Sequence, residues 1–358
     1  MPDLLLNVAD YARAAGAKLA HDVCDYYEGG ALDEITLREN IAGWERLKLY
    51  YHVLAGVKDR DLSTTVLGKK ISMPICVAPT AFHKLACAEG EIATARAAQA
   101  TGTLFVLSSL SNTAMESVLP AAASPRWFQL YIYKDREITR ALVQRAEAAG
   151  AEAIVLTVDA PGLGTRERDM RNRFTLPDGL CVENLSPLGK GKMPEVIGSG
   201  LAAYVRDNFK SDLGFDDLDW LCGCTKLPVV VKGVCRGDDA RRASDHGAKA
   251  IIVSNHGGRQ LDTAPATSEV LPLIVDLVGD RCEIYVDGGI RRGSDVLKAI
   301  ALGARAVMVG RPILWGLTVA GEEGARHVLE ILRHELDEAM LLSGCTTLHD
   351  INRLLLMP

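Results

Sequence analysis

Residues 228–255 read PVVVKGVCRGDDARRASDHGAKAIIVSN, and the pattern within them decides the fold. A short run of mostly β-branched residues, 228–233, precedes a helical stretch, 237–247, and a second apolar run follows at 250–255. Gly247 ends the helical stretch, at the position where a C-cap glycine is typical. Runs that are short and almost continuously apolar indicate strands buried on both faces, as in a parallel sheet. The stretch therefore predicts one strand–helix–strand unit.

The same pattern recurs along the chain from about residue 71. The apolar runs are 71–79, 104–109, 127–132, 153–159, 228–233, 250–255, 283–289 and 306–311. Helical stretches between them include 89–102, 135–150, 237–247 and 294–303. Eight strand–helix units in series predict an α/β protein with a (β/α)8 TIM barrel. A doubly wound sheet is the alternative, but the glycine fingerprint of dinucleotide-binding sheets is missing after the first strand.

Three segments of the chain fall outside this repeat. Residues 1–70 are predicted to form a helical N-terminal cap that ends in an extended lead-in. Residues 161–215, rich in Gly, Pro, Ser and charged residues, are predicted to be a long irregular lid insertion after the fourth strand. Residues 321–358 are predicted to form C-terminal helices. The whole chain, 1–358, is then a single domain with its barrel at 71–320.

Composition excludes several classes of function. The formal net charge is −6, which argues against a general binder of nucleic acid or of anionic membranes. No window reaches the roughly 18 apolar residues of a spanning helix, and the N-terminus has no secretion signal. The nine cysteines are scattered, with no metal-ligand spacing, so we expect reduced thiols and no metal site. A soluble cytoplasmic protein is the expectation.

Two glycine-rich turns follow the last two predicted strands. They are DGGIRR at 287–292 and VGRP at 309–312. Barrels often bind phosphate at these two strand ends, where glycine lets the backbone approach closely and arginine supplies the countercharge. The alternative is that the glycines only make tight turns. Two such turns, each with an arginine (Arg291 and Arg311), favour a phosphate site.

The stretch SNHGGRQLD, 254–262, carries the strongest chemical signal. His256 stands three residues before Arg259 at a predicted strand end, and Asp159 ends another strand. A neutral imidazole can accept a proton, and a carboxylate behind it can stabilise the imidazolium that forms. Arg259 can hold a substrate carboxylate through two hydrogen bonds. This pattern predicts a general base beside a carboxylate-binding arginine.

With these motifs the chain resembles the FMN-dependent (S)-2-hydroxy-acid oxidases and dehydrogenases, which include glycolate oxidase and lactate oxidase. The resemblance runs from DYYEGGALDEITL at 25–37 to LSGC at 342–345, and it includes LTVDAPGLGTRERD at 156–169, SNHGGRQLD, VDGGIRRG and VGRP. It implies FMN as cofactor, a small 2-hydroxy acid as substrate, dioxygen as electron acceptor with release of hydrogen peroxide, and a homo-oligomer, either a tetramer or an octamer.

The resemblance also implies roles for individual residues. The implied catalytic residues are His256 as base, Asp159 behind it, Tyr131 and Lys232. The substrate would contact Tyr26, Leu110, Tyr131, Arg166 and Arg259. The cofactor would contact Pro79, Thr80, Ala81, Ser108, Gln129, Thr157, Lys232, Ser254, Asp287, Gly288, Gly289, Arg291, Gly310 and Arg311.

One departure from the family bears on the substrate. Leu110 stands where plant-type glycolate oxidases carry a tryptophan, so we expect L-lactate or a somewhat larger 2-hydroxy acid to be preferred over glycolate. A dehydrogenase that uses a quinone or another acceptor is one alternative, although the polar stretch 177–200 lacks an apolar anchor. A non-redox barrel isomerase or aldolase with the same phosphate site is another, and a non-catalytic binding or structural protein is a third.

Overall fold

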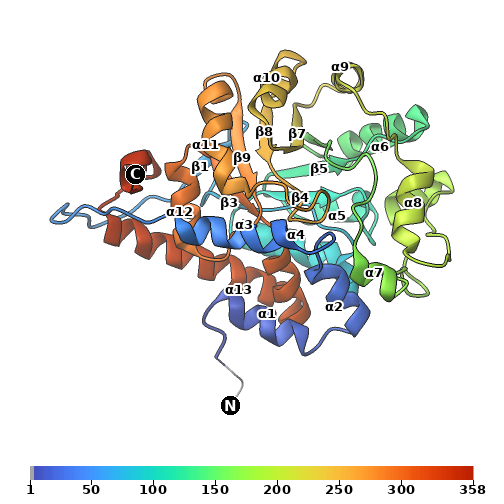
Figure 1. Cartoon of the computed structure of the whole chain (residues 1–358), viewed down its shortest axis with the longest axis horizontal. Helices are drawn as coiled ribbons and strands as arrows, with labels where there is room; N and C mark the ends of the chain where they lie inside the picture. The colour runs from blue at the N-terminus through green and yellow to red at the C-terminus, as the bar shows by residue number, and fades with distance from the viewer. Residues whose placement is uncertain (1–3, 358) are drawn as a thin grey trace.

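The computed structural model describes residues 4–357, and at its centre is a closed barrel of eight parallel strands (Figure 1). The strands follow one another round the barrel in chain order, and the last pairs with the first. They are β3 (Ile75–Val77), β4 (Phe105–Ser108), β5 (Arg126–Leu130), β6 (Ile154–Thr157), β7 (Val229–Val234), β8 (Ala250–Val253), β9 (Glu283–Asp287) and β10 (Ala306–Val309). Each forms within or across one of the predicted apolar runs, and the predicted TIM barrel is confirmed.

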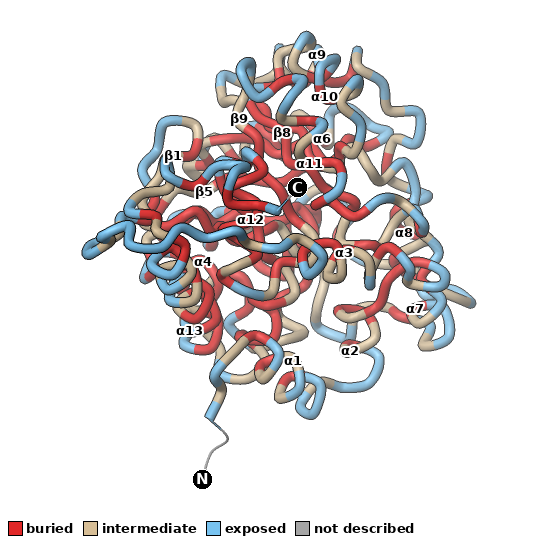
Figure 2. Tube along the Cα trace, turned by 60° about the vertical axis from the view of Figure 1, so that its left-hand side comes forward, coloured by how far each residue is buried: buried red, intermediate tan, exposed pale blue. Residues whose placement is uncertain are grey.

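The strands are apolar on both faces because both faces are covered. One set of alternating side chains fills the barrel interior, where Trp127 and Tyr285 pack edge to face with ring centroids 5.6 Å apart. The other set packs against the surrounding helices in a larger cluster. Figure 2 shows the buried residues concentrated at the centre of the molecule. Such double burial explains the continuous rather than alternating hydrophobic pattern.

Helices between the strands, and one after the last strand, form the outer layer. They are α4 (Gly90–Ala100), α5 (Met115–Val118), α6 (Arg136–Ala148), α9 (Phe215–Cys224), α10 (Gly237–Asp245), α11 (Thr267–Val278), α12 (Gly293–Ala301) and α13 (Arg311–Ser343). The last of these is interrupted by a kink, because Ala320 and Gly321 have non-helical backbone angles. Short 3-10 turns complete the chain at η1 (His83–Leu85), η2 (Leu119–Ala121), η4 (Leu348–Asp350) and η5 (Arg353–Leu355).

The N-terminal segment folds as helices followed by a hairpin. The helices are α1 (Val8–Gly16), α2 (His21–Glu28) and α3 (Ile35–Arg46), and the hairpin strands are β1 (Thr64–Val66) and β2 (Lys69–Ile71). Val66 and Ile71 belong to the same apolar cluster as the barrel interior, so the hairpin packs against that interior. Only an extended lead-in was expected here. The turn residues Leu67 and Gly68 both have positive φ, 46° and 78°, a conformation usually marked by Asn-Gly.

The insertion after β6 is more ordered than its composition predicts. It contains α7 (Glu167–Arg171), η3 (Glu183–Leu188) and α8 (Gly200–Asn208), so the prediction of an irregular stretch is wrong in part. The Ser199 side chain accepts a hydrogen bond from the Ala202 amide and thereby caps α8. A backbone bridge between Tyr133 and Phe209 then joins the end of the insertion to the chain that follows β5.

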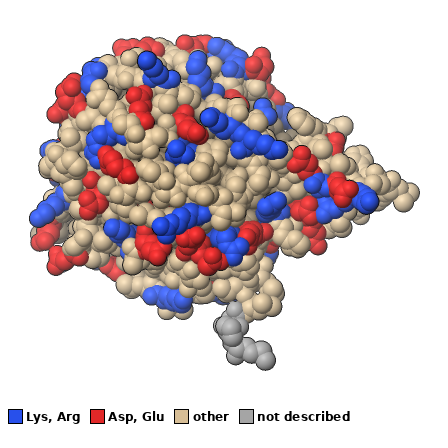
Figure 3. All heavy atoms as spheres, turned by 180° about the vertical axis from the view of Figure 1, so that it is seen from behind, with Lys and Arg blue, Asp and Glu red and all other residues tan. Residues whose placement is uncertain are grey.

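Charges of both signs are mixed on the surface. Figure 3 shows Lys and Arg side chains interspersed with Asp and Glu over the face turned away from Figure 1. All nine cysteines are free. Within residues 4–357, no helix has both the length and the apolar character needed to cross a membrane.

Candidate active site

A cavity opens at the carboxyl ends of the barrel strands and is covered by the N-terminal segment and the insertion. Every barrel strand, or the residues directly after it, contributes to the lining. The sequence-predicted residues that line it are Tyr26, Pro79, Thr80, Ala81, Ser108, Leu110, Gln129, Tyr131, Thr157, Arg166, Lys232, His256, Arg259, Asp287, Gly288, Gly289, Arg291, Gly310 and Arg311. The structure thus brings together side chains that are up to 285 positions apart in sequence.

Two predicted residues do not line the cavity and lie behind it. Asp159 contacts His256, as expected for a carboxylate behind the base. Ser254 is completely buried and does not line the cavity, and its contact with the cofactor stays a prediction. Its hydroxyl accepts hydrogen bonds from Lys232 Nζ at 3.0 Å and from the His256 amide at 3.1 Å. Ser254 therefore holds two residues that do face the cavity.

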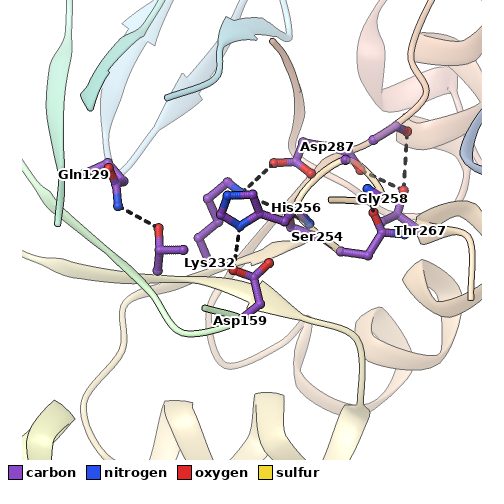
Figure 4. Close-up of polar contacts among 12 residues, drawn as sticks. Gln129, Asp159, Lys232, Ser254, His256, Gly258, Thr267 and Asp287 are labelled. Atoms are coloured by element: carbon purple, nitrogen blue, oxygen red, sulfur yellow. Dashed lines mark hydrogen bonds and ion pairs between the residues drawn. The ribbon is translucent and has the colours of Figure 1, made fainter. Parts of the chain in front are cut away.

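His256 and Asp159 form a directed pair (Figure 4). The Nδ1 atom of His256 lies 2.8 Å from Asp159 Oδ1. An ionised carboxylate can only accept, so Nδ1 carries the proton and Nε2 keeps a free lone pair. Burial lowers the pKa of His256 despite the opposing effect of Asp159. Burial raises the pKa of Asp159, but His256 outweighs it and the net shift is downward. The imidazole is therefore neutral and able to accept a proton.

The backbone that presents His256 is held in an uncommon conformation. His256, Gly257 and Gly258 all have positive φ, at 58°, 67° and 74°. A reciprocal pair of amide hydrogen bonds, each 2.8 Å long, joins Asn255 in this loop to Asn40 of α3. Asn255 Oδ1 also accepts a hydrogen bond from the Gly258 amide. The cap helix thus fixes the loop that carries the base, as strained loops at functional sites require.

Lys232 and Asp287 form a second buried pair, with Nζ and Oδ2 3.1 Å apart (Figure 4). Burial lowers the pKa of Lys232, but the carboxylates of Asp287 and Asp159 outweigh burial and the net shift is upward. The ammonium is therefore charged. The other oxygen of Asp287, Oδ1, is buried and has no hydrogen-bond partner in the part of the chain that the structure describes. An unsatisfied acceptor that belongs to a cavity-lining residue indicates a ligand donor at this point.

A row of uncharged polar side chains crosses the cavity floor. Ser108 Oγ donates to Gln129 Oε1 at 3.1 Å, and Gln129 Nε2 donates to Thr157 Oγ1 at 3.0 Å. Ser108 ends β4, Gln129 lies in the adjacent strand β5, and Thr157 ends β6 on the other side of β5. All three are buried. Such a row suits a flat polar ring laid across the barrel, because amides and hydroxyls can both donate and accept.

Two arginines and two tyrosines form another wall of the cavity. Arg166 is buried, and burial together with the neighbouring Arg259 lowers its pKa to about 10. The Arg259 guanidinium stands 5.1 Å from the ring centroid of Tyr26. Burial raises the pKa of Tyr26, and burial followed by Asp159 raises that of Tyr131, so both hydroxyls remain donors. Asp169 lies 3.9 Å from Arg166, too far for a hydrogen bond. The four side chains therefore have donors available for a carboxylate ligand.

The turns after β9 and β10 form a cationic cradle. Burial lowers the pKa of Arg291 to about 10, and burial with Arg259 and Arg291 lowers that of Arg311 to about 9. The Arg311 guanidinium donates to the backbone carbonyls of Tyr27, Gly29 and Gly257. Gly289 must be glycine, since a Cβ there would lie 1.9 Å from a backbone oxygen of α3. Among residues 4–357 neither Arg291 nor Arg311 forms an ion pair with an acid, and shielded guanidiniums of this kind indicate an anion site such as phosphate.

Several lining residues were not predicted from the sequence. Apolar side chains from the insertion cover one side of the cavity, and they carry no chemical signal that a sequence could reveal. Gln260 was also missed, although its amide donates to the carbonyls of Asp159 and Gly162 and so joins the base loop to the insertion. The unpredicted apolar lining residues that belong to the insertion are Leu163, Leu201, Val205 and Phe209.

Comparison with known proteins gives matches over almost the whole chain. A family model described as FMN-dependent dehydrogenase matches residues 15–358. An L-lactate oxidase from Nostoc sp. is 51% identical over 352 residues, which cover 97% of this chain and 96% of the relative. Human 2-hydroxyacid oxidase 1 is 50% identical, with 98% and 96% covered. A crystal structure of mandelate oxidase with (S)-4-hydroxymandelic acid has a TM-score of 0.94, 41% identity and 98% coverage of both chains.

Proposed function

The chain belongs to the FMN-dependent dehydrogenase family, and we propose that it oxidises an (S)-2-hydroxy acid to the 2-oxo acid, with dioxygen as electron acceptor. It is an FMN-dependent oxidoreductase, and its relatives are oxidases of 2-hydroxy acids. The observation that carries the proposal is the neutral imidazole of His256, paired with the Asp159 carboxylate, in one cavity with Arg166 and Arg259. A base beside a carboxylate-binding pair matches the two ends of a 2-hydroxy acid. The non-redox alternatives have no use for this arrangement.

The residues of the cavity fit FMN. Arg291 and Arg311, which form no ion pair with any described acidic residue, would hold the phosphate against the glycine turns. The unpartnered Oδ1 of Asp287 would accept from a sugar-alcohol hydroxyl. Ser108, Gln129 and Thr157 would lie against the ring. When bound, FMN supplies the two-electron acceptor that no side chain can provide.

The chain's own residues then account for substrate binding and proton transfer. Arg166 and Arg259 bind the substrate carboxylate, and the hydroxyls of Tyr26 and Tyr131 donate hydrogen bonds beside it. The substrate hydroxyl faces His256 Nε2, which accepts its proton, and Asp159 stabilises the imidazolium that results. General-base catalysis of this kind contributes about 10²–10⁴ in rate.

Lys232 supplies the electrostatic part of the mechanism. Its ammonium is buried and charged, and Asp287 and Ser254 fix its position. A fixed positive charge in a water-poor site stabilises negative charge that develops beside it without reorganisation. Lys232 therefore favours the reduced state of the group bound in the cavity.

Hydrogen peroxide is the proposed second product. The relatives with about 50% identity are named oxidases, which supports dioxygen rather than a quinone. The test is to measure peroxide formation and dye reduction side by side, with L-lactate as substrate. Peroxide formed in step with substrate consumption is the expected result. Dye reduction without peroxide would make the protein a dehydrogenase.

Substrate size is set by apolar side chains, and we propose L-lactate or a somewhat larger acid over glycolate. Leu110 is buried at the cavity wall, and Leu163, Leu201 and Val205 of the insertion line the same cavity. These side chains can contact a methyl or longer group, which glycolate lacks. Each methylene in such a pocket is worth about 1–3 kcal/mol, so the preference is graded. Comparison of kcat/KM for glycolate and L-lactate tests it, and a higher value for glycolate would contradict it.

A homo-oligomer, tetramer or octamer, is also proposed. Four large apolar side chains stand close together on one exposed arm, Tyr50, Tyr51, Val53 and Leu54, with exposed fractions of 62% or more. An exposed patch of this kind favours burial against another chain. Light scattering on the purified protein measures the mass, and a monomer would contradict the proposal.

A further inference from the structure

A buried histidine outside the cavity contacts a residue that lines it. His83 is 1% exposed and begins η1, shortly after residues 79–81, which follow β3. Its Nε2 lies 2.7 Å from Thr80 Oγ1, and its Nδ1 lies 2.8 Å from Thr94 Oγ1 on α4. Thr80 lines the cavity, whereas His83 and Thr94 do not. The imidazole therefore connects a helix of the outer layer to a cavity hydroxyl.

The hydrogen bonds decide which nitrogen of His83 carries the proton. The Thr94 hydroxyl has two acceptors within reach, the Gly90 carbonyl at 3.5 Å and His83 Nδ1 at 2.8 Å. Thr94 is completely buried, so its hydroxyl proton needs an acceptor, and a carbonyl at 3.5 Å lies beyond the usual range of an O–H···O hydrogen bond. Thr94 thus donates to Nδ1, which must be unprotonated, and the proton of the neutral ring lies on Nε2.

This protonation determines what Thr80 offers to a ligand. Nε2–H donates to Thr80 Oγ1, so the oxygen has one acceptor site filled and its own proton free. In the opposite tautomer Nε2 would accept a hydrogen bond from the Thr80 hydroxyl. The Thr80 oxygen could then only accept hydrogen bonds from a ligand in the cavity. Burial also lowers the pKa of His83, which keeps the ring neutral.

We propose that His83 is a positioning residue that makes the Thr80 hydroxyl a hydrogen-bond donor toward the FMN bound in the cavity. The inference rests on the proposed function, because it takes Thr80 as part of the cofactor site. It concerns affinity for FMN, and His83 itself touches neither substrate nor cofactor.

The surrounding loop is held too firmly to adjust if the imidazole is removed. Phe82 has a positive φ of 63° and is completely buried, which is uncommon for a bulky residue. The Tyr27 hydroxyl donates to the Phe82 carbonyl at 2.7 Å, and Glu91 Oε1 accepts from the His83 amide at 3.1 Å. The Thr80 methyl stands against Gly310, where a Cβ would lie 3.1 Å from it. Loss of the His83 ring therefore leaves Thr80 in place but without its partner.

The test is a double-mutant cycle read out as FMN affinity, measured by quenching of flavin fluorescence as FMN is added to protein stripped of it. One hydrogen bond is worth about a fivefold change in Kd. Thr80→Val removes the donor and should raise the Kd of FMN about fivefold. His83→Leu leaves the hydroxyl free to turn away and should raise the Kd by about two- to fivefold, and the double variant should be no weaker than Thr80→Val. His83→Gln keeps both a donor and an acceptor and should restore the Kd to within about twofold.

Thr101→Val is the matched control. It removes a buried threonine hydroxyl near the other end of the same helix, where the hydroxyl bonds only backbone carbonyls. Its Kd should equal that of the wild type. Additive effects of His83→Leu and Thr80→Val, or an unchanged Kd in His83→Leu, would overturn the proposal. Wild-type protein that fails to bind FMN would instead contradict the proposed function.

The tautomer can be measured independently by ¹⁵N NMR of histidine-labelled protein, with His83→Leu to identify the signals. We expect Nδ1 of His83 to resonate as an unprotonated nitrogen and Nε2 as a protonated one. The reverse pattern would overturn the proposal even if affinity changed.

Discussion

Replacement of Asp159 by asparagine tests how the carboxylate supports the base. Asp159 Oδ1 accepts from His256 Nδ1 at 2.8 Å, and both side chains are shielded from solvent. Asparagine keeps the shape and can still accept this hydrogen bond. It removes the negative charge that would face the imidazolium when His256 takes the substrate proton. The change therefore acts on the charged state of the base and leaves its position intact.

The size of the effect follows from the value of a hydrogen bond to a charged group. Such a bond contributes about 1.5–3 kcal/mol, and about 1.4 kcal/mol corresponds to a factor of ten in rate. We expect kcat/KM for L-lactate to fall roughly 10- to 150-fold in Asp159→Asn. The assay is initial-rate peroxide formation between pH 4.5 and 9.

The pH profile supplies a second readout. His256 is active when neutral, and burial lowers its pKa below the usual 6.5. The acidic limb of the pH–activity profile, along which activity rises with pH, therefore lies below pH 6.5. Asp159 opposes this shift, so its loss moves the limb to still lower pH. Asp219→Asn is the control, because Asp219 pairs with His246 at the surface, 2.9 Å away. An effect below threefold in Asp159→Asn, or an unmoved limb, would refute the reasoning.

Three further predictions concern specificity, stability and the anion site. Leu110→Trp should lower kcat/KM for L-lactate relative to glycolate by about tenfold, because an indole fills the space of the substrate methyl; steady-state kinetics with both acids measures it, and an unchanged ratio would contradict it. Asn40→Ala leaves the buried Asn255 amide without its partner, and urea unfolding should show a loss of about 1–3 kcal/mol; full stability would contradict it. FMN at about 100 times its Kd should stabilise the protein by about 2.7 kcal/mol in thermal unfolding. Arg311→Met should lose most of that stabilisation at the same FMN concentration, and a full shift would remove Arg311 from the phosphate site.

Much of the barrel could be predicted from the sequence because strands buried on both faces are nearly continuous apolar runs. Each run such as 250–255 is short, apolar and followed by polar residues at the cavity end. The strand ends also carry most of the chemistry, so His256, Lys232 and Asp287 could be placed in one site before any coordinates. Parallel strands in a closed barrel bring their carboxyl ends to one rim, which makes the inference a matter of topology.

Other features lacked a local signal. The hairpin of β1 and β2 turns at Leu67-Gly68, and leucine is a rare residue at a positive φ. Leu201 and Val205 line the cavity only because α8 folds back over the barrel, which composition could not show. The role of His83 depends on distances to Thr80 and Thr94, and neither spacing nor residue type reveals them.

The most direct test of the account is the reduction of the bound flavin by L-lactate under nitrogen, followed by absorbance in wild type and in His256→Asn. Asparagine tolerates the positive φ of 58° at this position, so the loop should keep its shape. We predict that the wild-type protein is yellow and bleaches on addition of L-lactate, and that the variant holds FMN but bleaches at least 100-fold more slowly. Bleaching of the variant at the wild-type rate would contradict the assignment of His256 as the base.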